Sequence, residues 1–416
     1  MLDALDREIE ARGLNEEVQL STCGCMGWCE MGPVMAVYPE GVCYRRVQPS
    51  DVPEIVAMHL RDGKPVDRLV WNDSAQMKAM SDAHREALRS AAAARNQVGM
   101  LPDRLDELIR GYMPSRCILT ALELDIFTAV GDGADAVQVG TRINANARAA
   151  GMLLNALVAL GLLSKSGEEY RNTAESARFF TQGSRDNRRD GLLHIAQVWH
   201  RWSTLTGAVR SGKRIPIGRD ETPEWTSNFI AAMHGNAKDH ADLLVKTLGT
   251  SGVRRILDLG GGSGAYSIAF AKACPAQCDI LDLPQVIPHT AEYVSRAGVS
   301  AQVSLRGGDI RQVDLGSGYD LILMNNIAHA FSEEQNRDIF CRARRALAPN
   351  GRIVVRDYIL NPDKTGPQRA AVFCLNMLVG TDGGATYSES EYTQWMNDAG
   401  FTEILRIPPG NLIVAS

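Results

Sequence analysis

A glycine cluster followed by two acidic residues is the part of this 416-residue chain that is best suited to chemistry. The run RRILDLGGGSGAYSIAFAKACPAQCDILDLP, residues 254–284, predicts a short apolar strand, a glycine loop, a helix and a second strand that ends on Asp282. Gly260 and Gly262 let a ligand approach the backbone, and the start of the helix offers unpaired N–H groups. A carboxylate at the end of the second strand can accept two hydrogen bonds from ribose hydroxyls. These residues predict a nucleotide-cofactor site.

The glycine spacing alone does not identify the cofactor. Gly260, Gly262 and Ala265 formally satisfy the G-x-G-x-x-G/A pattern of dinucleotide enzymes. Further along, LRGGDI places Asp309 at the end of a third strand, where an acid can accept a hydrogen bond from an adenine amino group. The chain continues with the strand and loop YDLILMNNIAHAFSEEQ, a helix over residues 333–347 and the strand GRIVVRDYIL.

This order of motifs resembles the class I S-adenosylmethionine methyltransferases. More narrowly, it resembles the O-methyltransferase family that includes acetylserotonin, caffeate and bacterial polyketide methyltransferases. The family hallmark runs DLGGGxG, DLPxV, GD and HDWxDE, and this chain has DLGGGSG, DLPQV, GD and HAFSEE. The resemblance implies S-adenosylmethionine as the cofactor and a hydroxyl of a small, aromatic acceptor as the methylated group. It implies cofactor contacts from Gly260, Gly262, Asp282, Asp309, Ile310 and Asn325.

The resemblance also implies a general base. The histidine of HDWxDE is His329 here, and a histidine can remove the proton that makes a neutral hydroxyl a poor nucleophile. Asp357 falls where the family has an acid that orients this base. However, Ala330 replaces the acid after the histidine, and Thr386 lies where the plant enzymes have a second orienting glutamate. Because fewer acids are expected to orient His329, the alternative to a hydroxyl acceptor is a thiol or sulfide, which ionises more easily. Candidate pocket walls, which are equally compatible with simple core positions, are Phe229, Met233, Phe373, Asn376 and Met377.

The resemblance covers roughly Leu101 to Ser416, three quarters of the chain. Residues 118–126 and 152–160 each predict a helix with an apolar face, matching the helical winged-helix dimerisation region of the family. Two such faces on a short segment exceed what one small subdomain usually hides, so we expect a homodimer.

Four of the nine cysteines crowd into STCGCMGWCEMGPVMAVYPEGVCYRRV, residues 21–47. This stretch resembles the second half of thioredoxin-like 2Fe-2S ferredoxins, and the resemblance places Cys25 and Cys29 at ligand positions. The family's first cysteine pair would lie upstream of Met1. Three explanations stay open: the start codon is set too late, Cys23 and Cys43 are substitute ligands, or the module is a degenerate scaffold without a cluster. With a cluster as the active part, the chain would be a redox sensor or electron carrier whose methyltransferase fold only binds ligand.

Composition limits the partners. A formal net charge of −5 and the absence of a dense Lys/Arg stripe argue against nucleic acid. No apolar run is long enough to span a bilayer, and the acidic amphipathic N-terminus is unlike a signal peptide, so we expect a cytoplasmic protein. The predicted fold class is α/β, with a doubly wound Rossmann-like sheet. The expected division is a truncated ferredoxin module (1–72), a helical linker (73–97), a winged-helix dimerisation domain (98–246) and the cofactor-binding methyltransferase domain (247–416).

Overall fold

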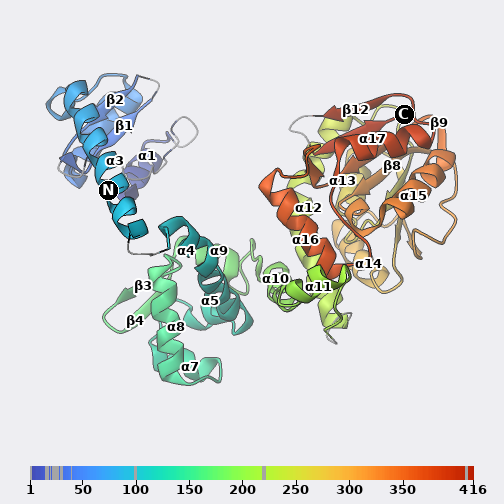
Figure 1. Cartoon of the computed structure of the whole chain (residues 1–416), viewed down its shortest axis with the longest axis horizontal. Helices are drawn as coiled ribbons and strands as arrows, with labels where there is room; N and C mark the ends of the chain where they lie inside the picture. The colour runs from blue at the N-terminus through green and yellow to red at the C-terminus, as the bar shows by residue number, and fades with distance from the viewer. Residues whose placement is uncertain are drawn as a thin grey trace. The chain divides into compact units, whose positions relative to one another are not determined.

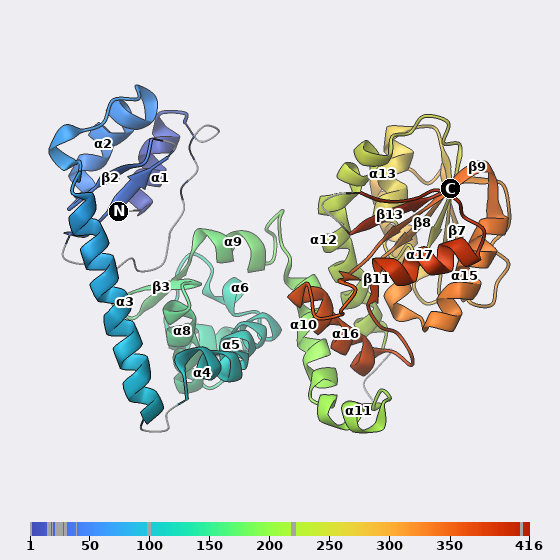
Figure 2. The same cartoon turned by 45° about the horizontal axis from the view of Figure 1, so that its top comes forward.

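The computed structural model describes residues 2–14, 18, 20, 28, 31–38, 40–97, 101–217, 222–407 and 411–416. The chain forms two compact units, Met1–Tyr112 and Met113–Ser416, and each is described by itself. Figures 1 and 2 trace the course of the chain through both units.

The first unit is a small α/β arrangement around Tyr44 and Ile55, both fully buried. The phenol of Tyr44 accepts a hydrogen bond from the Val66 amide (2.9 Å) and contacts Nδ1 of His59 (2.8 Å). Its elements are α1 (Leu2–Ala11), the antiparallel pair β1 (Met35–Val37) and β2 (Val42–Tyr44), η2 (Pro49–Asp51), α2 (Val52–Ile55), the π-helix η3 (Val56–Arg61), η4 (Asp67–Leu69), α3 (Ser74–Gln97) and α4 (Asp103–Arg110). The predicted linker helix over residues 73–97 is α3.

Cys25 and Cys29, the predicted metal ligands, lie outside the described residues, as does Cys23. Cys43 is described and is a partly buried free thiol on β2. Among the residues that the structure describes, no group of three or more His, Cys, Asp or Glu side chains is arranged to hold a metal ion. The cluster therefore stays a prediction from the sequence.

The second unit begins with helices and one hairpin. The buried centre of this helical segment contains residues from both predicted apolar faces, namely Leu122, Ile126, Leu154 and Leu157. Met152, which we placed on the second of these faces, is instead 61% exposed, because the opposite side of the same helix packs inward. The elements are α5 (Tyr112–Glu123), α6 (Ile126–Val130), α7 (Ala136–Arg142), α8 (Ala147–Ala159), β3 (Leu163–Ser166), β4 (Glu169–Asn172) and α9 (Ala174–Phe180).

Three further helices lead to the sheet: α10 (Arg189–Trp202), α11 (Leu205–Ser211) and α12 (Pro223–Leu248). Thr222 caps α12 by accepting a hydrogen bond from the Trp225 amide (3.1 Å), and proline occupies the first helical position. Both α10 and α11 contact α16 (Gln368–Gly380), a helix from the C-terminal part of the chain. The helical segment is thereby joined to the half of the unit that contains the sheet.

A seven-stranded sheet forms the rest of the unit, in the order β12-β13-β9-β8-β5-β6-β7. Strands β5 to β9 are parallel, whereas β13 pairs antiparallel with both β9 and β12. The bounds are β5 (Arg255–Leu259), β6 (Gln277–Asp282), β7 (Val303–Gly307), β8 (Tyr319–Asn325), β9 (Leu347–Arg356), β12 (Ile404–Ile407) and β13 (Leu412–Ala415), with the short parallel pair β10 (Ile359–Leu360) and β11 (Tyr387–Ser388) alongside.

Side chains alternate between the two faces of this sheet. Ile256 joins the core under α12 and the helices α13 (Ala265–Ala273) and α14 (Ile287–Ala297), whereas Leu257 joins the core under α15 (Glu333–Ala346) and α17 (Glu389–Asp398). Figure 2 shows α12 and α13 on one side of the sheet and α15 and α17 on the other. This confirms the predicted doubly wound α/β fold. No helix among the described residues is long and apolar enough to cross a membrane.

Candidate cofactor and catalytic site

The glycine loop turns directly at the end of β5. Gly260 has φ 65°, and a Cβ there would lie 2.7 Å from Cγ1 of Ile327, so a larger residue would displace the loop that follows β8. Gly262 has φ 57°, and the nearest atom to a Cβ there, Cδ1 of Ile230, would be 3.9 Å away. The backbone at Gly262 thus faces open space, as a ligand-binding loop requires.

Asp282 lies at the end of β6, beside this loop. Its Oδ2 accepts a hydrogen bond from the Gly262 amide (2.8 Å), and its Oδ1 accepts one from the Leu283 amide (2.7 Å). Burial raises the pKa of the carboxyl above its usual range, although both hydrogen bonds favour the ionised form. Each oxygen retains a lone pair, so Asp282 can still accept from two hydroxyls.

Asp309 follows β7, as expected, but its carboxylate is already paired. The Arg311 guanidinium donates to Oδ2 through Nη2 (2.6 Å) and to Oδ1 through Nε (3.0 Å), which lowers the pKa of the carboxyl. Arg311 was not among the residues predicted from the sequence, although an arginine two residues after an acid in a loop is a recognisable signal. An adenine amino group at Asp309 would share the carboxylate with Arg311. The adjacent Ile310 is buried in the core under α15.

Asn325 ends β8 at the same edge of the sheet. The residue is 8% exposed, and neither Oδ1 nor Nδ2 of its side chain has a hydrogen-bond partner among the described residues. A buried, unpaired carboxamide costs free energy unless a ligand satisfies it. Both atoms therefore fit a polar group of a bound cofactor, and Asn325 is the strongest structural indication that this edge binds one.

His329 lies in η5 (Ala328–Ala330), the turn that follows β8. Its Nδ1 donates to Oδ1 of Asp357 (2.5 Å), and its backbone amide donates to Oδ2 of the same carboxylate (3.1 Å). The phenol of Tyr392, which is fully buried on α17, also donates to Oδ2 (3.3 Å), and the Tyr358 amide donates to Oδ1 (2.7 Å). The structure thus brings together the predicted base and its orienting acid. Tyr392 was missed because it lies 35 residues beyond Asp357 without a motif of its own.

The two departures from the family pattern have structural substitutes. Thr386 is buried and donates its hydroxyl to the Ala370 carbonyl (3.2 Å). Instead, Asn336 of α15 holds the turn that contains His329. Its side-chain amide donates to the carbonyls of Ala328 (3.0 Å) and Phe331 (3.2 Å). The backbone at His329 is therefore held by Asp357 and Asn336, without an acid at position 330 or 386.

Aromatic rings border His329. The Phe373 ring on α16 meets the His329 ring edge-on at 4.9 Å, and it stacks on Tyr358 at 4.0 Å with an interplanar angle of 19°. Asn376, one turn further along α16, accepts a hydrogen bond from the indole of Trp202 (2.9 Å). Of the expected pocket walls, Phe373 therefore lies against the base, whereas Asn376 ties α16 to α10.

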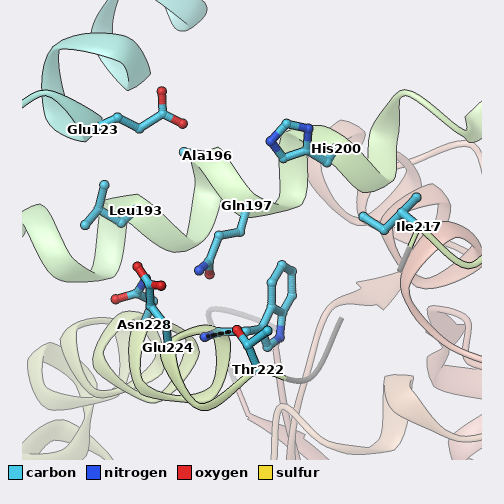
Figure 3. Close-up of a pocket in the computed structure, with 10 residues that line it drawn as sticks. Glu123, Leu193, Ala196, Gln197, His200, Ile217, Thr222, Glu224 and Asn228 are labelled. Carbon is cyan, nitrogen blue, oxygen red and sulfur yellow. Dashed lines mark hydrogen bonds between the residues drawn. The ribbon is translucent and has the colours of Figure 1, made fainter. Parts of the chain in front are cut away.

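A separate pocket of about 390 Å³ opens between α10 and the first turns of α12 (Figure 3). Gln197 of α10 points toward α12 there, and its Oε1 is buried without a partner among the described residues. None of the predicted site residues lines this pocket; its walls include Leu193, Gln197, His200, Trp225 and Asn228.

Comparisons with known proteins found matches over most of the chain. The model of the O-methyltransferase domain matches residues 207–402, and that of the O-methyltransferase dimerisation domain matches residues 106–182. The chain is 32% identical over 330 residues to 3-hydroxy-5-methyl-1-naphthoate 3-O-methyltransferase of Streptomyces sahachiroi, covering 76% of this chain and 94% of the relative. It is 30% identical to the tetracenomycin polyketide synthesis 8-O-methyl transferase TcmO of Streptomyces glaucescens, covering 73% and 92%. The solved structure of PigF with SAH matches at 28% identity and a TM-score of 0.71, covering 76% of this chain and all of PigF.

Proposed function

This chain belongs to the O-methyltransferase family and is an S-adenosylmethionine-dependent methyltransferase, and from this premise we propose that it methylates a phenolic hydroxyl of a small aromatic acceptor. The observation that carries the proposal is the double hydrogen bond between His329 and Asp357. The names of the two Streptomyces relatives, a hydroxynaphthoate methyltransferase and a polyketide methyltransferase, support an aromatic acceptor.

We infer that the cofactor lies along the glycine loop. The open space at Gly262 and the unpaired carboxamide of Asn325 fit a bound polar ligand, and Asp282 has lone pairs for ribose hydroxyls. Gly260 allows the loop to turn sharply at the end of β5. In this proposal, Asp309 and Ile310 lie beside the adenine group of the cofactor. When bound, S-adenosylmethionine supplies an electrophilic methyl group on a sulfonium.

The proton moves through His329. Because Nδ1–H donates to Asp357, Nε2 keeps the lone pair that can accept the proton of the acceptor hydroxyl. The proton leaves as the new O–C bond forms and the S–C bond breaks, which gives a methyl ether and S-adenosylhomocysteine. The buried carboxylate of Asp357 stabilises the imidazolium that results. The resemblance to a catalytic dyad supports a hydroxyl rather than a thiol acceptor, since a thiol ionises without this assistance.

A planar acceptor fits the aromatic border of the base. Phe373 and Tyr358 present stacked rings beside His329, and the guanidinium of Arg369 lies 5.6 Å from the centre of the Tyr358 ring. Aromatic side chains favour offset stacking or edge contacts with another ring. The proposed acceptor is therefore a phenol whose ring packs against Phe373.

The experiment is a comparison of His329→Ala with the unchanged enzyme on a phenol and on an aryl thiol. We expect the phenol kcat near neutral pH to fall by roughly 10²–10⁴, while the thiol reaction and the dissociation constant of S-adenosylhomocysteine change little. A phenol kcat that stays within about threefold of the unchanged enzyme would reject His329 as the base.

We further propose a homodimer and the four-part division given above. The segment matched by the dimerisation model exposes large apolar side chains, among them Leu108 (64%) and Met152 (61%), which a partner chain would cover. The mass of one chain is 45.3 kDa, and sedimentation velocity should give twice that mass. Cys25 and Cys29 as ligands of a 2Fe-2S cluster rest on the sequence resemblance alone.

A further inference from the structure

The cofactor loop is held in place by polar side chains from three different elements. Asp282 of β6 accepts a hydrogen bond from the Gly262 amide, and Thr290 of α14 donates its hydroxyl to the Gly262 carbonyl (2.6 Å). The third contact comes from α12: Nδ1 of His234 lies 2.9 Å from Oγ of Ser263. The first contact follows from the family motif, whereas the third has no counterpart in the motifs that the chain shares with the family.

Ser263 is the only non-glycine residue between Gly260 and Gly264, and it is 2% exposed. It stands between Gly262 (φ 57°) and Gly264 (φ 75°), both in the left-handed region. Glycine backbones have many accessible conformations, and ordering them costs conformational entropy. A side-chain contact on Ser263 restricts the loop before any ligand binds, which reduces the ordering cost that binding would otherwise include.

His234 is itself fixed. Its ring stacks on Tyr293 of α14 at 4.1 Å with an interplanar angle of 26°, and the next residue, Gly235, accepts a hydrogen bond from Arg188 (3.0 Å). Burial, with the positive charges of Lys238 on α12 and Arg188 before α10, lowers the pKa of His234. The imidazole is therefore neutral at pH 7, and its Nδ1 can accept the hydroxyl proton of Ser263.

We propose that His234 is a positioning residue for the cofactor loop: its hydrogen bond to Ser263 holds the loop in the conformation that receives S-adenosylmethionine. The contact also joins this loop to α12, the helix that carries the candidate pocket walls Phe229 and Met233. The inference rests on the cofactor site proposed above. It predicts an effect on cofactor affinity and none on the chemical step.

Two substitutions separate the hydrogen bond from the ring stack. His234→Asn keeps a hydrogen-bonding atom close to the position of Nδ1 but removes the ring, whereas His234→Phe keeps the ring and removes that atom. By calorimetry with S-adenosylhomocysteine, we expect His234→Phe to bind about threefold to tenfold more weakly, the loss of one hydrogen bond, and His234→Asn to bind within about twofold of the unchanged protein. His240→Phe, on the exposed part of the same helix, is the matched control and should bind normally.

Ser263→Ala removes the other partner. It should weaken binding as much as His234→Phe, and the double variant should be no weaker than either single variant, because all three lack the same contact. Ser263→Ala also keeps the test available if His234→Phe does not fold. In the ligand-free protein, the amides of Gly262 and Gly264 should exchange hydrogen faster in both variants.

In steady-state assays the KM for S-adenosylmethionine should rise while kcat at saturating cofactor stays unchanged. Normal binding by His234→Phe together with weakened binding by His234→Asn would show that only the ring matters and would overturn the proposal. So would additive losses in the double variant. If Asp282→Ala also binds S-adenosylhomocysteine normally, the proposed cofactor site is wrong, and the failure does not concern His234.

Discussion

The carboxylate of Asp357 holds His329 at two points, the ring Nδ1 at 2.5 Å and the backbone amide at 3.1 Å. A single carboxylate thus fixes both the tautomer of His329 and the position of its main chain. The side chain of Asp357 is completely buried, and the phenol of Tyr392 provides a further donor. In the proposed mechanism, this arrangement orients His329 without the second acid of the plant enzymes that the chain resembles.

Asp357→Asn should lower kcat on a phenol by roughly 10²–10⁴, because a carboxamide does not select the Nδ1–H tautomer and cannot stabilise the imidazolium. Tyr392→Phe removes one weak donor to the same oxygen and should cost less than about tenfold. Both variants should bind S-adenosylhomocysteine normally in calorimetry. An Asp357→Asn enzyme with nearly full activity would contradict the proposed orientation of the base.

Asp282→Ala should weaken binding of S-adenosylhomocysteine by about 1–3 kcal/mol, because the ribose hydroxyls lose a charged acceptor and the Gly262 amide loses its partner. Glu292→Ala, on the exposed side of α14, is a suitable control. Calorimetric titration decides the matter, and an unchanged affinity would mean that the ribose lies elsewhere.

Asn325→Leu should separate stability from binding. Leucine has the same branched skeleton of side-chain heavy atoms and removes two buried, unpaired polar atoms, so the ligand-free protein should be as stable as before or more stable by about 1 kcal/mol. Affinity for S-adenosylhomocysteine should nevertheless fall about tenfold or more, because the ligand loses its hydrogen bonds. If stability falls and affinity does not, Asn325 has a structural partner and is not a ligand contact.

Lowering the pH should change the free energy of unfolding through two buried groups, His194 and Asp258, whose contributions have opposite signs. Burial, and then the nearby charge of Arg201, lowers the pKa of His194 to about 4. Between pH 4 and 6.5 the unfolded chain binds this proton and the native state does not, so stability is lost as pH falls through that range, by at most about 3 kcal/mol. Burial raises the pKa of Asp258 to about 6, so between pH 3.8 and 6 the native state holds the extra proton and stability rises as pH falls.

One substitution at each position separates the contributions of His194 and Asp258 to the pH dependence of stability. His194→Phe keeps the edge contacts with Trp225 and Phe229 and should gain stability relative to the unchanged protein as pH falls from 6.5 to 4. Asp258→Asn should lose relative stability over pH 6 to 4. Urea denaturation of the ligand-free proteins at several pH values measures both differences, and parallel curves for His194→Phe and the unchanged protein would refute the assignment of a neutral, buried His194.

The cysteines of the N-terminal segment lead to a prediction about how much iron the chain binds. With Cys25 and Cys29 as the only matching ligand pair, anaerobic reconstitution of this chain should give fewer than two irons per subunit, since a 2Fe-2S cluster normally takes four protein ligands. Iron and sulfide analysis with an absorption spectrum measures this. Two irons per subunit, lost on Cys25→Ser or Cys29→Ser but kept on Cys43→Ser, would show that the module is complete.

Local patterns were enough for much of the fold. The glycine loop between two apolar strands, the acids at the strand ends and the apolar faces of residues 118–126 and 152–160 each depend on neighbours within a few positions, so the sequence predicted β5, β6, α5 and α8. The pair of His329 and Asp357 was expected from the family resemblance, and the parallel strands β8 and β9 account for it because their carboxyl ends meet at one edge of the sheet.

Contacts between distant segments required the tertiary structure. Tyr392 reaches Asp357 from α17, Arg311 occupies Asp309, and His234 reaches Ser263 from α12, each through packing that no local period encodes. Met152 shows the converse: its residue type fits the apolar face, but packing of α8 leaves it exposed. Sequence determined which residues stand at the strand ends, since backbone geometry follows from nearby residues. Only the tertiary structure decided which of them are paired, buried or left open, because those properties depend on where separate helices meet the sheet.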